Sequence, residues 1–581
     1  MPLRPTLLLL YVVPLGLCGQ LGNTMKTFTR ADTLRGSIGP ERAWWNALHY
    51  DVRVKPDFAS RGIQGHTTIT FEAIDEGKRM QIDLQQPLVV DSIVAEISTF
   101  WDSGGGYSTP KLDFDREGDV LWVDFPKELP ADVRMPVHVY YHGVPRAAKN
   151  PPWDGGWVWA KDPKGHPWMT VACQGLGASV WYPCKDHQSD EPDNGATLRI
   201  TVPDSLQAIG NGRLKGIIKH GDGTSTWHWS VSSPINTYNL VPYIGKYSHF
   251  GEVYDGLDGP LDLDYWVIAG NEEKARRQFA QVPGMLACFE EWFGPFPFYS
   301  DGFKLVESPH LGMEHQSAIA YGNRYVNGYM GQDLSGTGHG LHWDYIIVHE
   351  SGHEWYGNNI TTADIADMWV HEGFTMYSEV LHVECTKGLE AAREYARGVR
   401  RNISNDGPVI GPYGVNKEGS GDMYPKGANV VHMVRRIMDD DTAFKTMLRD
   451  MNRDHRHGIV TSAMIEAYMD QRETFDLRPL FAQYLRDVRI PMLQWGRYKG
   501  RAYLRWTNTI EGFSMPLRFR AGRAEEFLEI TTLWSAPEGG IRRRDRVEPD
   551  PDWYIGVERI PTRTLKKEVS LAPKRYIKVK P

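Results

Sequence analysis

Residues 348–374, VHESGHEWYGNNITTADIADMWVHEGF, restrict what this chain can fold into more than any other segment. The flanking pattern DYIIVHESGHEWYG predicts a helix that begins near Asp344 and ends at Gly357. Within the segment are three His-Glu pairs: His349-Glu350, His353-Glu354 and His371-Glu372. The fold must therefore accommodate the titratable side chains of these three pairs close to one another.

His349 and His353 lie four residues apart, so a helix directs both imidazoles to the same face. Two neutral imidazoles at this spacing can bind one Zn²⁺ ion. Glu350 lies about 100° further round the helix, outside the row of ligands but within reach of a water on the metal. The pattern predicts two metal ligands, His349 and His353, and a general base, Glu350.

A third ligand is expected on the next helix. The positions where a metzincin site requires Gly and His carry Tyr356 and Asn359, which excludes that class. The segment DIADMWVHEGFTMYSEVLHVE has a helical period and places Glu372 with 18 residues between it and His353. Two imidazoles and one carboxylate leave a fourth position for water, as in catalytic zinc sites, whereas structural sites are more often closed by four cysteine-rich ligands. We predict one Zn²⁺ per chain and a zinc hydrolase.

The other members of the three pairs are predicted to be bystanders. His371 and Glu354 point away from the expected metal, so we expect them on the surface or in support of a ligand. Glu379, two turns after Glu372 on the same face, is a candidate hydrogen-bond partner for a ligand.

Length and composition indicate a folded, multidomain protein. The chain has 581 residues, which is far longer than one hydrophobic core usually serves, so two to four domains are expected. Hydrophobic residues at 41% and charged residues at 24% exclude disorder as the main state. The net charge is −8 and basic residues are scattered, so we expect no nucleic-acid partner.

The first residues, MPLRPTLLLLYVVPLGLCGQ, predict an export signal over residues 1–19. Arg4 supplies the charged start, and the apolar stretch 6–17 is too short to span a bilayer. Further apolar runs fall short of the roughly 20 residues of a span, so we expect no transmembrane segment and a periplasmic or extracellular location. Residues 15–18 faintly resemble a lipobox, so a lipid anchor at Cys18 that tethers the protein to a membrane is an alternative, although Leu17 stands where a small residue is favoured.

Cys173 and Cys184 are close in sequence. They could form a disulfide in an oxidising compartment or remain buried free thiols, and the sequence leaves both open.

The hydrophobic pattern divides the chain into three domains and predicts a multidomain α+β fold. Short alternating runs such as QGHTTITFEAID predict an all-β domain over residues 40–260. Helical spacing then dominates and predicts a mostly helical domain over residues 261–488. Strand-like runs return over residues 489–581 and continue to the end of the chain, which predicts a small β-sandwich.

His349-Glu350-x-x-His353, followed after 18 residues by Glu372, resembles the gluzincin zinc aminopeptidases, the family that includes aminopeptidase N and leukotriene hydrolase. The resemblance extends over most of the chain. It implies a saddle-like N-terminal β domain, a thermolysin-like catalytic domain and a small C-terminal β-sandwich.

The segment LGMEHQSAIAYGN resembles the exopeptidase motif Gly-x-Met-Glu-Asn of that family. The resemblance implies that Gly312, Met313 and Glu314 bind substrate and that the Glu314 carboxylate holds the free α-amino group. Leu311 and His315 stand where the family usually has Gly and Asn, so the shape of this pocket is expected to differ.

Two further segments resemble family motifs. CQGLGASVWYPCKD implies that Gln174 joins the amine site, and GDMYPKGANVV implies that the Tyr424 hydroxyl stabilises the tetrahedral intermediate. The implied function is a zinc aminopeptidase that removes the N-terminal residue from peptides with a free N-terminus.

Two alternatives remain at this stage. One is a zinc-dependent epoxide hydrolase, which would need a deep apolar channel beside the same metal site. The other is a secreted binding protein with a degenerate site, which is disfavoured because the ligands, the base and the tyrosine are all intact.

Overall fold

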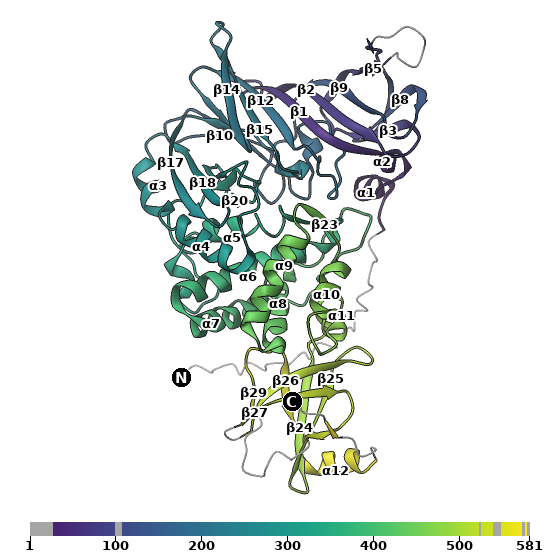
Figure 1. The fold of residues 1–581 in the computed structure, drawn as a ribbon, viewed down its shortest axis with the longest axis vertical. Coiled ribbons are helices and arrows are strands. Elements are labelled where there is room, and N and C mark those ends of the chain that lie inside the picture. Colours follow the sequence, from purple (N-terminus) through teal and green to yellow (C-terminus); the bar gives the residue numbers. More distant parts are fainter. Residues whose placement is uncertain (1–26, 99–106, 522–523, 538–547, 572–575, 578–581) are drawn as a thin grey trace, which may run out of the picture.

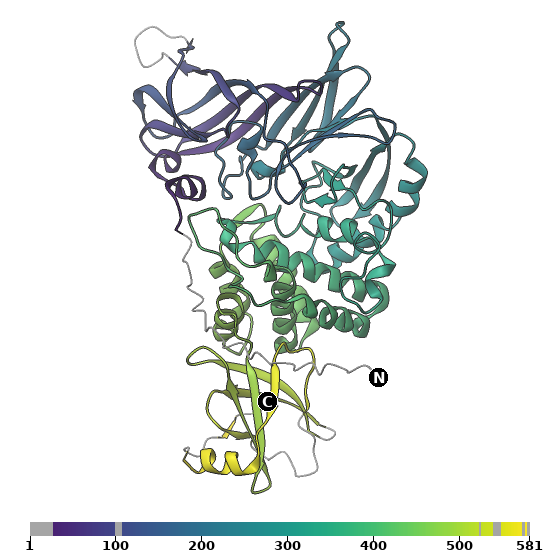
Figure 2. The same ribbon diagram turned by 180° about the vertical axis from the view of Figure 1, so that it is seen from behind.

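The computed structural model describes residues 27–98, 107–521, 524–537, 548–571 and 576–577. Three regions follow one another along the long axis of the molecule, an N-terminal β region, a helical region and a C-terminal β region (Figure 1). The view from behind shows the same order, with the helical region between the two β regions (Figure 2). The predicted signal segment 1–19 and Cys18 lie outside the described residues.

The N-terminal region is built on a seven-stranded sheet in the order β14-β15-β12-β1-β2-β9-β4. Strand β2 shows why it forms, because its residues alternate between buried and more exposed positions from end to end. Its neighbour β1 pairs with β2 in antiparallel and with β12 in parallel register. The strands are β1 (Trp45–Asp57), β2 (Gly62–Ala73), β4 (Val89–Ala95), β9 (Arg134–Gly143), β12 (Ala196–Pro203), β14 (Arg213–Lys219) and β15 (Thr224–Val231).

Smaller sheets complete this region, among them the two-stranded β5 (Ile97–Ser98) and β6 (Tyr107–Ser108). A three-stranded sheet, β3-β8-β7, consists of β3 (Gly77–Asp83), β8 (Val120–Leu129) and β7 (Asp113–Glu117). A four-stranded sheet, β10-β11-β16-β13, consists of β10 (Gly156–Lys161), β11 (Pro167–Ala172), β16 (Tyr243–Gly245) and β13 (Gln207–Ile209). The four-stranded sheet positions two residues of the candidate site. Gln174 follows β11, and Tyr238 lies in the short helix η3 (Thr237–Asn239), which precedes β16.

A mixed five-stranded sheet, β17-β18-β19-β21-β20, connects the N-terminal region to the helices. Its strands are β17 (Tyr247–Gly256), β18 (Gly259–Ile268), β19 (Phe303–Glu307), β20 (Gly312–Met313) and β21 (Ile319–Tyr321). The predicted domain boundary at residue 260 falls inside the β17–β18 hairpin, and both strands of this hairpin belong to the sheet that contains β19.

The helical region is organised around α6 (Trp369–Lys387), which packs against α4, α5, α7 and α8. Every residue of α6 from Trp369 to Val383 is buried, as expected of a helix surrounded by others. The other helices are α3 (Glu272–Phe279), α4 (Val282–Phe293), α5 (Tyr345–Gly352), α7 (Leu389–Val399), α8 (Pro425–Met438), α9 (Asp441–Asp454), α10 (Ser462–Asp470) and α11 (Arg478–Arg486).

The C-terminal region has two three-stranded sheets, β25-β24-β30 and β27-β26-β29. Their strands are β24 (Met492–Tyr498), β25 (Arg501–Thr507), β26 (Ser514–Ala521), β27 (Ala524–Thr531), β29 (Glu548–Pro549) and β30 (Gly556–Arg559). The predicted α+β organisation of a β region, a helical region and a short β region is confirmed.

One prediction for the C-terminal region is wrong. Residues expected to be strand-like form a helix, α12 (Thr562–Leu571). Leu565 and Val569 are four residues apart, and Leu565 is fully buried against Trp534 and Ile560. The spacing of these apolar residues is helical, and alternation does not describe it.

The disulfide in the structure is not the one that closeness in sequence suggests. Cys173 and Cys184 are both buried and free, which settles the alternative left open above. A disulfide instead joins Cys288 in α4 to Cys385 in α6. Among the described residues, no helix combines the length and apolarity needed to cross a membrane.

Candidate metal centre and active-site cavity

Helix α5 places the two predicted imidazole ligands on one face. Asp344 caps its N-terminus, with Oδ1 accepting from the backbone N–H groups of Ile346 and Ile347. The regular helix ends at Gly352, earlier than the predicted end at Gly357, but His353 still has helical backbone angles. The imidazole rings of His349 and His353 therefore lie close together, with centroids 5.0 Å apart.

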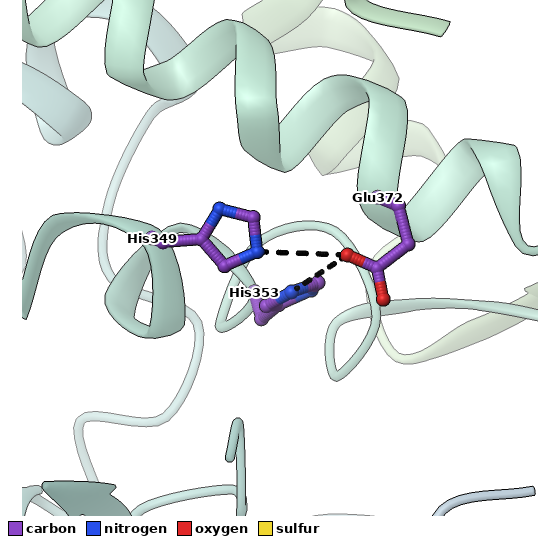
Figure 3. Close-up of side chains that lie close together, drawn as sticks. All are labelled: His349, His353 and Glu372. Carbon is purple, nitrogen blue, oxygen red and sulfur yellow. Dashed lines mark ion pairs between the residues drawn. The ribbon is translucent and has the colours of Figure 1, made fainter. Parts of the chain in front are cut away.

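Helix α6 supplies the carboxylate from its first turn. Glu372 Oε2 lies 3.6 Å from His349 Nε2 and 3.3 Å from His353 Nε2. Figure 3 shows the two rings, from α5 and the turn after it, directed at the Glu372 carboxylate. All three side chains are buried, and one potential ligand atom from each lies within 4.8 Å of the other two. Separations of about 3.3 Å suit atoms that each lie about 2.0–2.1 Å from one tetrahedral Zn²⁺.

The other nitrogen of each imidazole is held by the protein. His349 Nδ1 lies 2.8 Å from Glu379 Oε1, and the Tyr395 hydroxyl donates to Glu379 Oε2 at 2.6 Å. His353 Nδ1 lies 3.0 Å from the backbone oxygen of Tyr356. These acceptors favour a proton on Nδ1 and leave the Nε2 lone pair of each ring for a metal. Glu379 thus contacts a metal ligand, as its position on the helix suggested. No sequence pattern pointed to Tyr395 as the partner of Glu379.

The electrostatics of the three ligands also fit a cation. Glu372 Oε2 is buried and makes no hydrogen bond with any described residue. Burial lowers the pKa of His349, but the neighbouring carboxylates of Glu372 and Glu379 outweigh this effect and raise that pKa well above the ordinary value. A divalent ion among the three ligands would replace the proton that these carboxylates attract. The donor set therefore fits a bound Zn²⁺.

Glu350 lies beside the metal ligands without joining them. A Cβ atom added to Gly312 would lie only 2.5 Å from Glu350 Oε1, so the β20 segment lies directly against this carboxylate. Burial raises the pKa of Glu350 to about 7, although the neighbouring imidazoles of His349 and His353 oppose that rise. A carboxylate with this pKa can exchange protons near neutral pH, which suits the predicted general base.

Glu314 follows β20 and lines the same cavity. Gln174 Nε2 donates to Glu314 Oε1 at 2.5 Å, and the Tyr238 hydroxyl donates to the same oxygen at 2.7 Å. One potential ligand atom each from Glu314, Glu350 and His353 lie within 4.8 Å of one another, so this carboxylate is next to the reacting centre. The structure thus brings Gln174 and Glu314 together and adds Tyr238, which sequence reasoning missed among 27 tyrosines.

The two departures from the exopeptidase motif have different surroundings. His315 is fully buried, and its Nδ1 lies 2.5 Å from the hydroxyl of Tyr243, which donates to the Ala318 backbone oxygen. His315 therefore helps to hold the segment between β20 and β21 through Tyr243. Leu311, together with Gly312, Met313 and Glu314, lines the cavity, so the changed position 311 does alter its wall.

Tyr424 comes to the site because α6 and α8 approach closely. A Cβ atom added to Gly373 in α6 would lie 2.9 Å from the Cα atom of Gly427 in α8, so glycine is required at this crossing. Tyr424 immediately precedes α8, and its ring lies 6.1 Å from that of His349. Burial raises the pKa of Tyr424 well above its ordinary value, and so do the carboxylates of Glu372, Glu314 and Glu418. The hydroxyl therefore keeps its proton and can donate.

The predicted site residues share one cavity of about 670 Å³. Its wall includes every residue predicted to bind metal, bind substrate or catalyse: Gln174, Gly312, Met313, Glu314, His349, Glu350, His353, Glu372 and Tyr424.

His371 and Glu354 are not on the surface, because both are fully buried. His371 Nε2 accepts from the backbone N–H of Thr362 at 2.9 Å, and Glu354 Oε1 accepts from that of Ser317 at 2.8 Å. The surface alternative for these two residues is wrong, since each satisfies a buried backbone donor.

A buried His-His-Glu group on two packed helices, with Glu350 beside it, is the arrangement that the gluzincin resemblance implies. Residues 278–484 match the family model described as the Peptidase family M1 domain. The helical region is thus similar to this peptidase family, in agreement with the resemblance read from the motifs.

Two similar relatives are leucine aminopeptidase 2 of Vanderwaltozyma polyspora and aminopeptidase B of Rattus norvegicus. The first is 25% identical over 246 residues, which cover 39% of this chain and 32% of the relative. The second is 24% identical over 349 residues, which cover 57% of this chain and 49% of the relative. The chain spans less than half the length of each of these relatives.

Solved structures share the fold. A two-domain M1 zinc metallopeptidase mutant bound to L-tryptophan has a TM-score of 0.62 and 20% identity, covering 76% of this chain and 94% of that chain. A Deinococcus radiodurans M1 zinc metallopeptidase mutant bound to a Tyr-Ser-Ala substrate also has a TM-score of 0.62 and 20% identity, covering 78% of this chain and 97% of that chain. The β region and the helical region thus have the arrangement of known M1 metallopeptidases.

Proposed function

We propose that this protein is a zinc-dependent aminopeptidase that removes the N-terminal residue from peptides. The observation that carries the proposal is the closeness of two sites, because the Glu314 carboxylate lies within 4.8 Å of ligand atoms of Glu350 and His353. A substrate whose α-ammonium pairs with Glu314 has its first peptide bond, and few others, near the metal ligands. The names of the relatives and the peptide bound to the Deinococcus radiodurans structure support the same activity.

Each residue of the cavity has a distinct task in this reaction. When bound by His349, His353 and Glu372, zinc supplies Lewis acidity that polarises the peptide carbonyl and acidifies a water molecule. Glu350 accepts the proton of the attacking water and returns it to the nitrogen of the leaving amine. The Tyr424 hydroxyl donates a hydrogen bond to the oxyanion that develops on the carbonyl oxygen.

The amine end of the site is organised before substrate arrives. Gln174 and Tyr238 both donate to Oε1 of Glu314, which fixes the orientation of the carboxylate. The α-ammonium of a free N-terminus is charged and can donate hydrogen bonds to this carboxylate. An acetylated nitrogen carries no charge and cannot form the same ion pair.

The test compares two peptides that differ only in N-terminal acetylation, in the presence and absence of a chelator. We expect release of the first residue from the free peptide, loss of that activity on chelation, and its return when Zn²⁺ is added. Equal cleavage of the acetylated peptide would contradict the exopeptidase assignment, and full activity after verified removal of zinc would contradict the metal assignment.

We further propose that the protein is exported to a periplasmic or extracellular location. Arg4 and the apolar stretch 6–17 support an export signal, and the Cys288–Cys385 disulfide suits an oxidising compartment. Mass analysis of the mature N-terminus tests this: cleavage near residue 19 is expected, a lipid on Cys18 would identify the tethered alternative, and an intact N-terminus in the cytoplasm would contradict export.

A further inference from the structure

The cavity wall carries far more negative than positive side chains. In the part of the chain that the structure describes, one ammonium group, Lys417, lines the cavity together with five carboxylates: Asp154, Glu314, Glu350, Glu372 and Glu418. A divalent cation and the substrate's α-ammonium would not neutralise this set. The cavity should therefore favour substrates with an additional positive charge.

Of these five carboxylates, Glu418 is the one with neither a role in the proposed reaction nor a bonding partner among the described residues. Glu372, Glu350 and Glu314 belong to the proposed reaction. Asp154 accepts from the backbone N–H of Lys149 at 2.6 Å through Oδ2 and from that of Asn150 at 2.8 Å through Oδ1. Glu418 is exposed on the cavity wall and makes no hydrogen bond or ion pair with the described residues.

The segment that carries Glu418 lies beside the amine end of the site. Asn416 Nδ2 donates to the backbone oxygen of Gly175 at 2.9 Å, and Gly175 directly follows Gln174, which bonds to Glu314. The side chain of a substrate's first residue branches from the carbon that bears its α-amino group. That side chain must therefore start close to the contact between residues 174–176 and 416–418.

Apolar side chains line the same part of the wall. A Cβ atom added to Gly175 would lie 3.9 Å from Ile365 Cδ1, which places Ile365 against this segment. Leu176 and Met368 line the cavity with it. An apolar surface next to a free carboxylate suits a long side chain with a hydrocarbon stem and a cationic head.

We propose that Glu418 makes this site selective for an N-terminal lysine or arginine. The stem of that side chain would pack along Leu176, Ile365 and Met368, and its ammonium or guanidinium group would pair with the Glu418 carboxylate. The inference rests on the proposed aminopeptidase function and names its substrate class.

The experiment measures kcat/KM of the zinc-loaded protein for the anilides of arginine, lysine and norleucine, the last a neutral analogue of lysine. We expect the basic anilides to exceed norleucine by at least about tenfold, the scale of a hydrogen bond to a charged group. Glu418→Gln should lower the arginine-to-norleucine ratio by about 10- to 100-fold. Inhibition constants of argininamide and norleucinamide should change in the same direction, which reports binding independently of turnover.

Two variants serve as matched controls. Asp154→Asn removes another carboxylate from the same cavity, but one whose oxygens are already bonded to backbone, so the ratio should change less than about threefold. Lys417→Gln removes the neighbouring cation and should leave the preference for basic residues in place or increase it. A loss of preference in Asp154→Asn equal to that in Glu418→Gln would overturn the assignment to Glu418.

The outcomes separate the two proposals. If the zinc-loaded protein cleaves no aminoacyl anilide or free peptide, the aminopeptidase function fails and this inference with it. If it cleaves the norleucine anilide as efficiently as the basic ones, or if Glu418→Gln keeps the wild-type ratio, the aminopeptidase function stands and the role of Glu418 is rejected.

Discussion

The two sides of the cavity are built in different ways. The metal side comes from one stretch, with His349, His353, Glu372 and Glu379 all on α5, the turn after it, and α6. The amine side joins Gln174, Tyr238 and Glu314, which are separated by up to 140 residues. One side is thus a property of two neighbouring helices, and the other exists only when distant segments meet.

The packing around the two sides differs in the same way. Ile346, Ile347 and Val348, which directly precede His349, belong to the hydrophobic core that includes the helical region. Met313, next to Glu314, is buried in the core of the N-terminal β region. Changes on the metal side should therefore affect every substrate, whereas changes on the amine side should affect recognition of the free N-terminus.

The largest expected effect comes from the base on the metal side. Glu350→Gln should lower kcat by about 10²–10⁴ while zinc remains bound, because the proton acceptor is lost and the three ligands are kept. Zinc content and kcat are measured on the same preparation. Glu354→Gln is the control, since Glu354 is buried one turn away and bonds to Ser317, and its kcat should stay near normal. Near-normal turnover by zinc-replete Glu350→Gln would refute the assignment.

A smaller effect is expected from the residue that supports His349. Glu379→Gln should weaken zinc binding by about 10- to 100-fold, because an amide is a poorer acceptor for His349 Nδ1–H than a carboxylate. Titration with a competing chelator measures the affinity. Glu384→Gln, on the same helix but paired with Arg435, should bind zinc like wild type. If both variants lose zinc equally, the effect belongs to α6 as a whole and the role of Glu379 is disproved.

The amine side should respond with a change in recognition. Tyr238→Phe removes one of the two donors to Glu314 Oε1 and should raise KM for free peptides by about tenfold, the scale of one hydrogen bond to a charged group. Zinc affinity should not change. Tyr182→Phe is the control, because its hydroxyl donates to the Thr237 backbone oxygen and does not contact Glu314. An unchanged KM in Tyr238→Phe would show that Gln174 suffices to hold the carboxylate.

The smallest effect on turnover is expected from the disulfide that braces the metal side. Replacing Cys288 and Cys385 with Ser should lower the free energy of unfolding by about 2–4 kcal/mol, because the unfolded chain loses a constraint. The kcat of the folded fraction should stay close to that of wild type, since neither cysteine lines the cavity. Chemical denaturation with and without reductant measures the difference, and equal stabilities would contradict it.

The fold was predictable in outline because the period of apolar residues changes along the chain. Alternation identified the β region, as the burial pattern of β2 shows, and helical spacing identified the region around α6. The same reasoning missed α12, where a short helix follows a run of strands. It also divided the β17–β18 hairpin, because alternation does not reveal which sheet a strand joins.

The sequence by itself determined the metal side of the site. His349 and His353 lie four positions apart, and a helix converts that spacing into one shared face, so local geometry is enough to predict the ligands and the base. Resemblance to known motifs added Gln174, Glu314 and Tyr424, and the structure places all three on the same cavity.

Only the tertiary structure decided which other residues meet the site. Tyr238 reaches Glu314, Tyr395 reaches Glu379 and Cys288 pairs with Cys385 through contacts between segments that no local pattern connects. Glu418 likewise gained its place from the bond between Asn416 and Gly175. Spacing along a helix is set by backbone geometry, whereas contacts across the cavity are set by how the β region packs on the helices.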